Sequence, residues 1–492
     1  MRFEVVWRRV IGPAGLTVLL AGCGGGEVRD ETPAATGGAR NVILLIGDGM
    51  GVSTVTAARI LAGQLAGGSG EENLLSFERF PHVALAKTYN TDMQVPDSAG
   101  TMSAMVTGRK TRAGVLSVAP ETPRGDCRMA QPMTTILEAA EQAGMATGLV
   151  TTTRITHATP AALYAHAADR NWEDDAALPA AARDAGCADI ARQWVEFPAG
   201  DGPDVVFGGG RAQFQSKIVA DPEYPEYNGR RLDGRDLIHE WQKRRPGSRY
   251  VWNRANFEQL DLTAPGPILG LFEPSHLHYE HDRGGDRAGE PSLSEMTRAA
   301  IAHLTADPDG FFLMVEGGRI DHAHHDGNAY RALTETIEFS RAVEVALAMT
   351  SRDDTLIVVT ADHSHVLAIA GYPARGNPIL GKVVGIDGRG ARQAAPAPAA
   401  DGKPYTTLAY ANGPGYTAGG ERPDLSAIDT ADPDYRPLGG VPLAAETHGG
   451  EDVAVYAIGP GAEAVHGVLE QNRIFDVLVD AAPRLRGDHG TE

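Results

Sequence analysis

Positive charge is what this chain lacks most. Its 44 lysines and arginines stand against 64 aspartates and glutamates, which leaves a formal net charge of −20. A protein that binds nucleic acid needs a basic face, so this balance excludes nucleic acid as an expected partner. An anionic substrate would need a local positive centre, and a cluster of bound divalent cations can provide one against a negative average.

The chain also lacks a long apolar run at its N-terminus. The stretch Val10 to Ala21 has 12 residues, too few to cross a bilayer. Arginines precede it and small residues end it, so we predict a signal peptide over residues 1–22 and a flexible linker over 23–40. The ending Leu20-Ala21-Gly22-Cys23 resembles a bacterial lipobox, in which Cys23 carries lipid and anchors an exported protein in the periplasm or at the cell surface. A simple cleaved signal with a chance cysteine is the alternative.

The order of the expected elements indicates the fold class. Length alone would allow about three domains, but strands and helices alternate through residues 41–370 and resume after 450. This pattern predicts one α/β core over 41–370 and 444–484, a large doubly wound, mostly parallel central sheet with helices on both faces. Residues 371–443 are rich in glycine, proline and alanine, which by composition favours a linker or disorder, and 485–492 form a tail.

One serine follows an acid at a predicted helix start. Pro96 ends an extended run, and Asp97 or Ser98 can cap the small-residue helix Ala99 to Val106. Free N–H groups and the helix dipole favour an anion there, which makes Ser98 a candidate nucleophile. The alternative is that the Asp-Ser pair only caps the helix.

Acids and histidines fall at the ends of predicted strands, where open α/β sheets place their ligands. The positions are Asp48 after Asn41 to Ile46; Glu316, Asp321 and His325 after Phe311 to Val315; Asp362 and His363 after Thr355 to Thr360; and His448 before Val453 to Ile458. Aspartate with histidine suits zinc, whereas carboxylate, hydroxyl and water suit magnesium. The sequence therefore predicts two kinds of metal ion. For any one pair alone, a surface role is the alternative.

Longer motifs resemble those of the alkaline phosphatases, and of the animal-type enzymes in particular. They include Lys87 to Asp92, Val150 to Pro160 and Tyr164 to Trp172, and matching segments run from about Asn41 to Val479. His157, where enteric bacterial enzymes carry aspartate, and His322, where they carry lysine, both follow the animal-type pattern. The resemblance implies hydrolysis of varied small phosphate monoesters through a phosphoserine at alkaline pH. A related phosphodiesterase or sulfatase, or a lipoprotein that binds phosphate or metal without turnover, are the alternatives.

The resemblance also assigns roles to single residues. Ser98 becomes the nucleophile and Arg170 the bidentate phosphate clamp, whose structural alternative is a salt bridge to Asp169 or Asp174. The implied metal ligands are Asp321, His325 and His448 for one zinc; Asp48, Asp362 and His363 for a second; and Asp48, Thr159 and Glu316, with His157 beside them, for magnesium. Histidine is a poor magnesium ligand, which leaves the identity of the third ion open.

Further features follow from the same resemblance. Residues 371–443 match a small crown-like subdomain over the active-site mouth. A structural calcium is implied, with Glu223, Glu273, Glu290 and the carbonyl of Phe272 as ligands. Cys127 and Cys187 sit where the family has a disulfide, with two buried free thiols as the alternative. A homodimer is expected, although residues 24–40 are too short to supply the family's N-terminal arm.

Overall fold

The computed structural model describes residues 38–416 and 421–486. The predicted signal peptide, Cys23 and nearly all of the linker lie outside these residues. Within the described ranges, no helix combines the length and apolarity that a membrane span requires.

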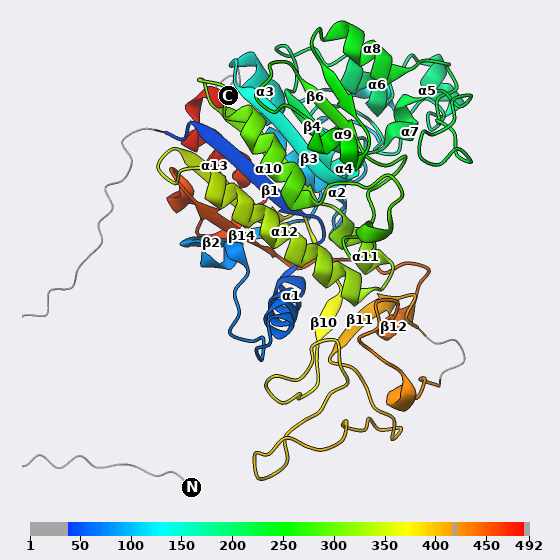
Figure 1. The fold of residues 1–492 in the computed structure, drawn as a ribbon, viewed down its shortest axis with the longest axis vertical. Helices are drawn as coiled ribbons and strands as arrows, with labels where there is room; N and C mark the ends of the chain where they lie inside the picture. Colours follow the sequence, from blue (N-terminus) through cyan, green and yellow to red (C-terminus); the bar gives the residue numbers. More distant parts are fainter. Residues whose placement is uncertain (1–37, 417–420, 487–492) are drawn as a thin grey trace, which may run out of the picture. The chain divides into compact units, whose positions relative to one another are not determined.

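A ten-stranded sheet forms the centre of the described chain, in the order β15-β2-β14-β8-β1-β7-β3-β4-β6-β5 (Figure 1). Its strands are β1 (Asn41–Gly47), β2 (His82–Lys87), β3 (Ala146–Arg154), β4 (Val205–Gly209), β5 (Arg249–Val251), β6 (Ile268–Leu271), β7 (Phe311–Gly317), β8 (Thr355–Ala361), β14 (Val453–Ile458) and β15 (Gly467–Glu470). From β8 to β5 all neighbours pair in parallel, whereas β14 runs antiparallel to both β8 and β2. The predicted mostly parallel α/β sheet is confirmed.

The register of the central strands aligns their carboxyl ends. Gly47 at the end of β1 pairs with Gly317 of β7 and with Ala361 of β8. Every residue of these three strands is buried, as expected for apolar strands covered on both faces. Side chains that follow the strands therefore meet at one edge of the sheet.

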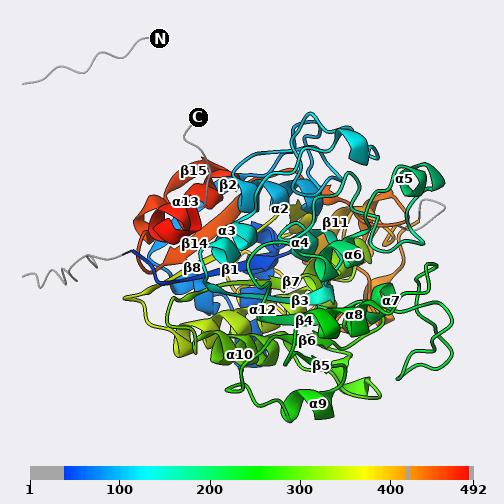
Figure 2. The ribbon, with the colours of Figure 1, turned by 90° about the horizontal axis from the view of Figure 1, so that it is seen from above.

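Helices cover both faces of the sheet, as predicted. Figure 2 shows α10 and α12 on one side and α2, α3 and α13 on the other. The helices are α1 (Val52–Leu65), α2 (Ser98–Thr107), α3 (Ile136–Gln142), α4 (Ala158–Ala161), α5 (Ala180–Asp184), α6 (Ile190–Val195), α7 (Arg211–Phe214), α8 (Leu237–Arg244), α9 (Arg254–Glu258), α10 (Leu293–Leu304), α11 (Arg319–His325), α12 (Ala329–Met349) and α13 (Arg473–Ala481). The short α11 lies directly after β7 and carries Asp321 and His325.

A separate three-stranded sheet contains β10 (Leu367–Ile369), β11 (Leu408–Gly413) and β12 (Gly439–Pro442). The segment 371–407 between β10 and β11 holds isolated bridges but no helix or strand, in line with its composition. Tyr410 of β11 reaches back to the core, and its hydroxyl lies 2.8 Å from His324 Nδ1 of α11. Two short strands, β9 (Ser364–His365) and β13 (His448–Gly449), pair with each other beside α11. One precedes the three-stranded sheet in the chain and the other follows it.

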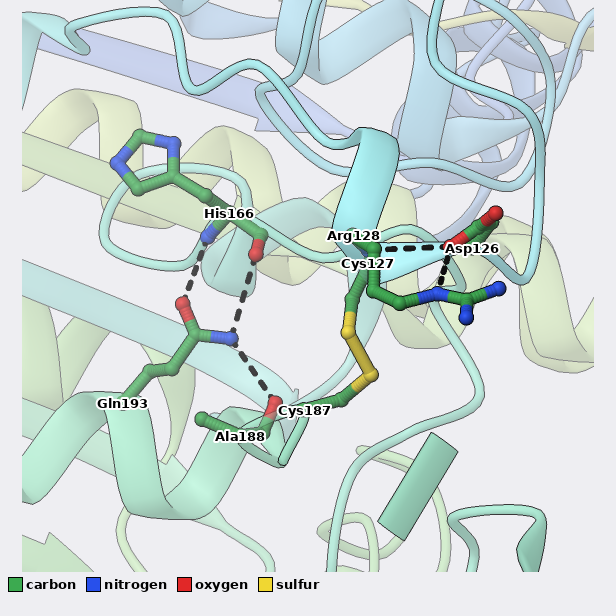
Figure 3. The surroundings of a disulfide bond; sticks show 7 residues. All are labelled: Asp126, Cys127, Arg128, His166, Cys187, Ala188 and Gln193. Carbon is green, nitrogen blue, oxygen red and sulfur yellow. Dashed lines mark hydrogen bonds and ion pairs between the residues drawn. A yellow bond between two sulfur atoms is a disulfide. The ribbon is translucent and has the colours of Figure 1, made fainter. Parts of the chain in front are cut away.

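Cys127 and Cys187 form a disulfide, which confirms the expected bridge (Figure 3). Their Cα atoms are 5.9 Å apart, and both cysteines pack against a small cluster that includes Ala168 and Trp172. Gln193 joins the neighbouring chain segments by accepting from the His166 N–H at 2.9 Å and donating to the Ala188 carbonyl at 3.2 Å. The disulfide therefore packs against residues on both sides of Arg170 in the sequence.

We expect the double variant Cys127→Ser/Cys187→Ser to unfold at a lower temperature than the parent. The bridge restricts the unfolded chain over a long loop, and its loss should reduce the free energy of unfolding by about 2–5 kcal/mol. Thermal unfolding with and without a thiol reductant measures this. Reductant should destabilise the parent and leave the double variant unchanged, and equal sensitivity of the two proteins would contradict the bridge.

Candidate metal centre and active site

Three carboxylates meet at the aligned strand ends. Asp48 follows β1, Glu316 lies in β7 and Asp362 follows β8, and all three side chains are fully buried. Burial, and then the negative charge of Asp362, raise the pKa of Asp48 well above its ordinary value, while burial raises the pKa of Glu316 to about 7. Asp48 Oδ1 and Glu316 Oε1 have no hydrogen-bond partner. Buried acids with unpaired oxygens are what a bound cation would satisfy.

Three histidines direct Nε2 toward this region and pair Nδ1 with the backbone. The Nδ1 atoms of His325, His363 and His448 lie 2.6, 3.2 and 2.7 Å from the backbone carbonyls of Glu446, Ser364 and Pro96. A carbonyl can only accept, so each Nδ1 carries a hydrogen, and a ring in its neutral form then has its lone pair on Nε2. This is the arrangement by which proteins orient metal-binding histidines.

The first group of donors is Asp321, His325 and His448, with His365 beside them. Asp321 Oδ1 lies 3.3 Å from the Nε2 atoms of both His325 and His448. Those two Nε2 atoms are only 3.1 Å apart. Two lone pairs at that distance repel unless a proton or a cation lies between them, so the group fits a metal ion.

His365 has a role that the sequence analysis did not assign. Its Nε2 lies 2.7 Å from Asp321 Oδ1 and its Nδ1 lies 2.5 Å from Glu446 Oε2. Burial opposes its protonation, but these two carboxylates raise the pKa of His365 to about 10. A protonated His365 has no lone pair to offer a metal, so it positions Asp321. In the sequence, the one indication of a role for His365 is its position two residues after His363.

The second group is Asp48, Asp362 and His363. His363 Nε2 lies 3.5 Å from Asp48 Oδ1 and 3.4 Å from Asp362 Oδ2. The backbone N–H groups of Gly49 and His363 donate to Asp362 Oδ1 at 3.0 and 2.8 Å, which fixes that carboxylate. Ser98 Oγ lies 3.2 Å from His363 Nε2, so the structure brings the candidate nucleophile to this group.

The third group is Asp48, His157 and Glu316. Thr159 of α4 donates to Asp48 Oδ2 at 3.5 Å, and the Thr151 and Thr153 hydroxyls donate to Glu316 Oε2. The residues expected to hold the third ion therefore lie together, beside two threonines that the sequence analysis did not single out. Burial, and then Arg170, hold the pKa of His157 well below its ordinary value.

Asp97 both caps helix α2 and binds Arg170. Its Oδ1 accepts from the Gly100 N–H at 3.1 Å, which leaves Ser98 as the first residue of the helix. Its Oδ2 accepts from Arg170 Nη1 at 3.2 Å, while Arg170 Nη2 lies 3.1 Å from His157 Nε2. The expected alternative partners of Arg170 are paired elsewhere, Asp169 with Arg124 and Asp174 with Arg230.

The residues expected to bind calcium divide into two sets. Glu273 and Glu290 converge with His278 and Asp286, neither of which the sequence analysis selected. Glu223 and the Phe272 carbonyl face the buried guanidinium of Arg211 instead. We call Glu273, His278, Asp286 and Glu290 the peripheral cluster. Burial, and then Glu290, raise the pKa of Glu273 to about 9.

Comparison with known proteins agrees with this geometry. The family model of alkaline phosphatase matches residues 39–483. The tissue-nonspecific alkaline phosphatase of Gallus gallus is 50% identical over 456 residues, which cover 90% of this chain and 84% of that protein. The human tissue-nonspecific isozyme is 48% identical, with the same coverage. The crystal structure of Thermus thermophilus alkaline phosphatase superposes with a TM-score of 0.65 at 26% identity, covering 95% of this chain and 96% of that one.

The match thus extends over the whole described core, from β1 to the end of α13, and includes all three donor groups. The chain therefore belongs to the alkaline phosphatase family and is a metal-dependent enzyme that hydrolyses phosphate monoesters.

Proposed function

We propose that Ser98 takes the phosphoryl group from the substrate. Ser98 is 2% exposed and is the first residue of helix α2, and its hydroxyl lies beside the second donor group. The N-terminus of a helix favours the negative charge of a bound phosphate. The single observation that carries the proposal is the 3.2 Å approach of Ser98 Oγ to His363 Nε2, which places the hydroxyl among the donor groups.

The proposed reaction is two displacements at phosphorus. Ser98 Oγ forms a bond to phosphorus while the bond from phosphorus to the substrate oxygen breaks, and the proton that Ser98 gives up leaves with the alcohol. A water oxygen then attacks the phosphoserine, the bond from phosphorus to Ser98 Oγ breaks, Ser98 regains a proton from the water, and inorganic phosphate is released. Positioning and charge account for most of the catalysis, because the transferred group is largely metaphosphate-like in the transition state.

The donor sets support specific ions. We propose zinc at Asp321, His325 and His448, zinc at Asp48, Asp362 and His363, and magnesium at Asp48, Thr159 and Glu316. Bound there, these ions would lower the pKa of the Ser98 hydroxyl and of the attacking water and would offset the charge of the oxygens on phosphorus. Mixed aspartate and histidine sets suit zinc, and the carboxylate and hydroxyl set suits magnesium.

Arg170 is the proposed phosphate clamp. Its planar fork can donate to two phosphate oxygens at once. Asp97 and His157 each hold one of its terminal nitrogens, so the plane of the guanidinium is fixed before substrate arrives. A fixed donor loses little freedom on binding, which strengthens its contact with the phosphate.

The proposal also covers the location, the assembly and the substrate range of the enzyme. The disulfide supports export to an oxidising compartment, since such bonds are rare in the cytosol. A lipid anchor at Cys23, a periplasmic or cell-surface location and a homodimer rest on the sequence motif and on the family resemblance. The proposed broad substrate range rests on the clamp, because Arg170 and the donor groups would contact the phosphate and not the alcohol.

We expect Ser98→Ala to lower kcat for p-nitrophenyl phosphate by on the order of 10³-fold or more, as for loss of a nucleophile. Acid quenching during turnover of labelled substrate should trap a phosphoprotein in the parent and none in the variant. Ser103→Ala is the matched control, because Ser103 lies in the same helix but its hydroxyl donates to the Ala99 carbonyl. Retention of the trapped phosphoprotein in Ser98→Ala would assign the nucleophile elsewhere.

We expect Asp97→Asn to weaken phosphate binding without removing the helix cap. Asparagine keeps an oxygen for the Gly100 N–H but loses the charge that holds Arg170. Loss of roughly 1 kcal/mol of orienting interaction raises the inhibition constant for inorganic phosphate about fivefold. Competition assays measure this, with Asp169→Asn, which breaks the exposed pair with Arg124, as the unchanged control. Equal inhibition constants for the two variants would contradict the clamp geometry.

A further inference from the structure

The peripheral cluster lies on the segment that joins β6 to α10. Glu273 follows β6 by two residues, and Glu290 stands two residues before Ser292, the N-cap of α10. One donor atom from each of Glu273, His278, Asp286 and Glu290 lies within 4.8 Å of the others. These residues are separate from the three groups around Ser98.

Each member of the cluster has a buried atom with no hydrogen-bond partner. These atoms are Glu273 Oε1, His278 Nδ1, Asp286 Oδ2 and Glu290 Oε2. The Glu273 and Glu290 residues are only 4% and 1% exposed. His278 Nδ1 lies 3.6 Å from Glu273 Oε1 and 3.7 Å from Glu290 Oε1, too far for hydrogen bonds but with room for an ion between them. Four unpaired donors around one point are expensive to bury, and a cation would satisfy all of them.

Two of the four residues expected to bind calcium, Glu223 and Phe272, already have their oxygens paired within the protein. Arg211 Nη1 donates to the Phe272 carbonyl at 2.6 Å, and Arg211 Nη2 donates to Glu223 Oε2 at 2.8 Å. The Ala288 N–H donates to the other oxygen of Glu223 at 2.9 Å. Arg211 is fully buried, so its charge cannot leave these partners for water. Without Glu223 and the Phe272 carbonyl, the peripheral cluster offers three carboxylates and a nitrogen rather than the all-oxygen set that calcium takes.

What remains is three carboxylates and one imidazole nitrogen. A nitrogen donor favours first-row transition metals over calcium, and four donors is the number that zinc takes in structural sites. We propose that the peripheral cluster binds a first-row transition-metal ion, with Zn²⁺ as the probe, through Glu273, His278, Asp286 and Glu290 in preference to Ca²⁺. The ion would join the two ends of the segment between β6 and α10 and stabilise it.

Metal analysis of purified, zinc-loaded protein tests the proposal. The parent should retain one more equivalent of zinc per chain than His278→Ala, and excess calcium should not displace it. The affinity at this site should fall by more than the roughly 10- to 100-fold expected for an outer-shell change. His281→Ala is the matched control, since His281 lies in the same segment but packs edge-to-face against Tyr330. The difference in zinc content between the parent and His278→Ala does not depend on how many ions bind around Ser98. The experiment therefore tests the peripheral cluster independently of the proposed reaction.

A second variant tests the choice of ion. His278→Asp makes the four donors all-oxygen, and we expect it to lose the extra zinc and to gain a rise in unfolding temperature with calcium. The parent should show that rise with zinc and not with calcium. Equal zinc content in the parent and His278→Ala, or displacement of the extra zinc from the parent by calcium, would overturn the proposal.

Discussion

Like charges buried at the ends of neighbouring parallel strands are the constraint on which this structure depends. The strands β8, β1, β7 and β3 are adjacent and in register, so Asp48, Glu316 and Asp362 are forced together in a site closed to water. Leaving one buried charge unpaired costs several kcal/mol, a large part of the about 5–15 kcal/mol by which a domain is stable. The folded chain therefore needs cations to offset these charges, and the contacts around the three carboxylates hold the metal-binding side chains in position.

The supports come from the backbone as much as from side chains. Three carbonyls set the tautomers of His325, His363 and His448, and two N–H groups hold Asp362. Gly49 shows how little room is left, because it has a positive φ and an added Cβ would lie 2.3 Å from the ring of His365. A side chain there would push His365 away from Asp321. The conformation of the turn after β1 is thus restricted by His365, and the Gly49 N–H in this turn is one of the two that hold Asp362.

The sequence predicts the part of this arrangement that depends on order along the chain. Apolar runs followed by acids identify the strands and their ends, and the family motifs name most donors. It does not predict what depends on contacts between distant segments. His365 was missed because its role arises from Glu446, about eighty residues away in the chain. Asp286 and His278 were missed because only the folded segment between β6 and α10 brings them to Glu273, and the competing contacts of Arg211 have no signature in the sequence at all. Whether Asp97 or Ser98 caps α2 was also open until the Gly100 contact decided it.

The contact between Arg170 and His157 limits what the third donor group can do. Burial and the guanidinium keep His157 neutral, so its ring has one acceptor nitrogen and one N–H. Arg170 Nη2 can only donate, and it lies 3.1 Å from Nε2, which must therefore be the acceptor. Nδ1 then carries the hydrogen and cannot bind a cation directly, although it is buried and has no hydrogen-bond partner. In this arrangement His157 would reach an ion at Asp48 and Glu316 only through a water molecule, and it links that group to Arg170, the proposed phosphate clamp. A carboxylate at this position would bind the ion directly. The histidine gives up that direct bond, and in its place it holds Arg170 in a fixed orientation.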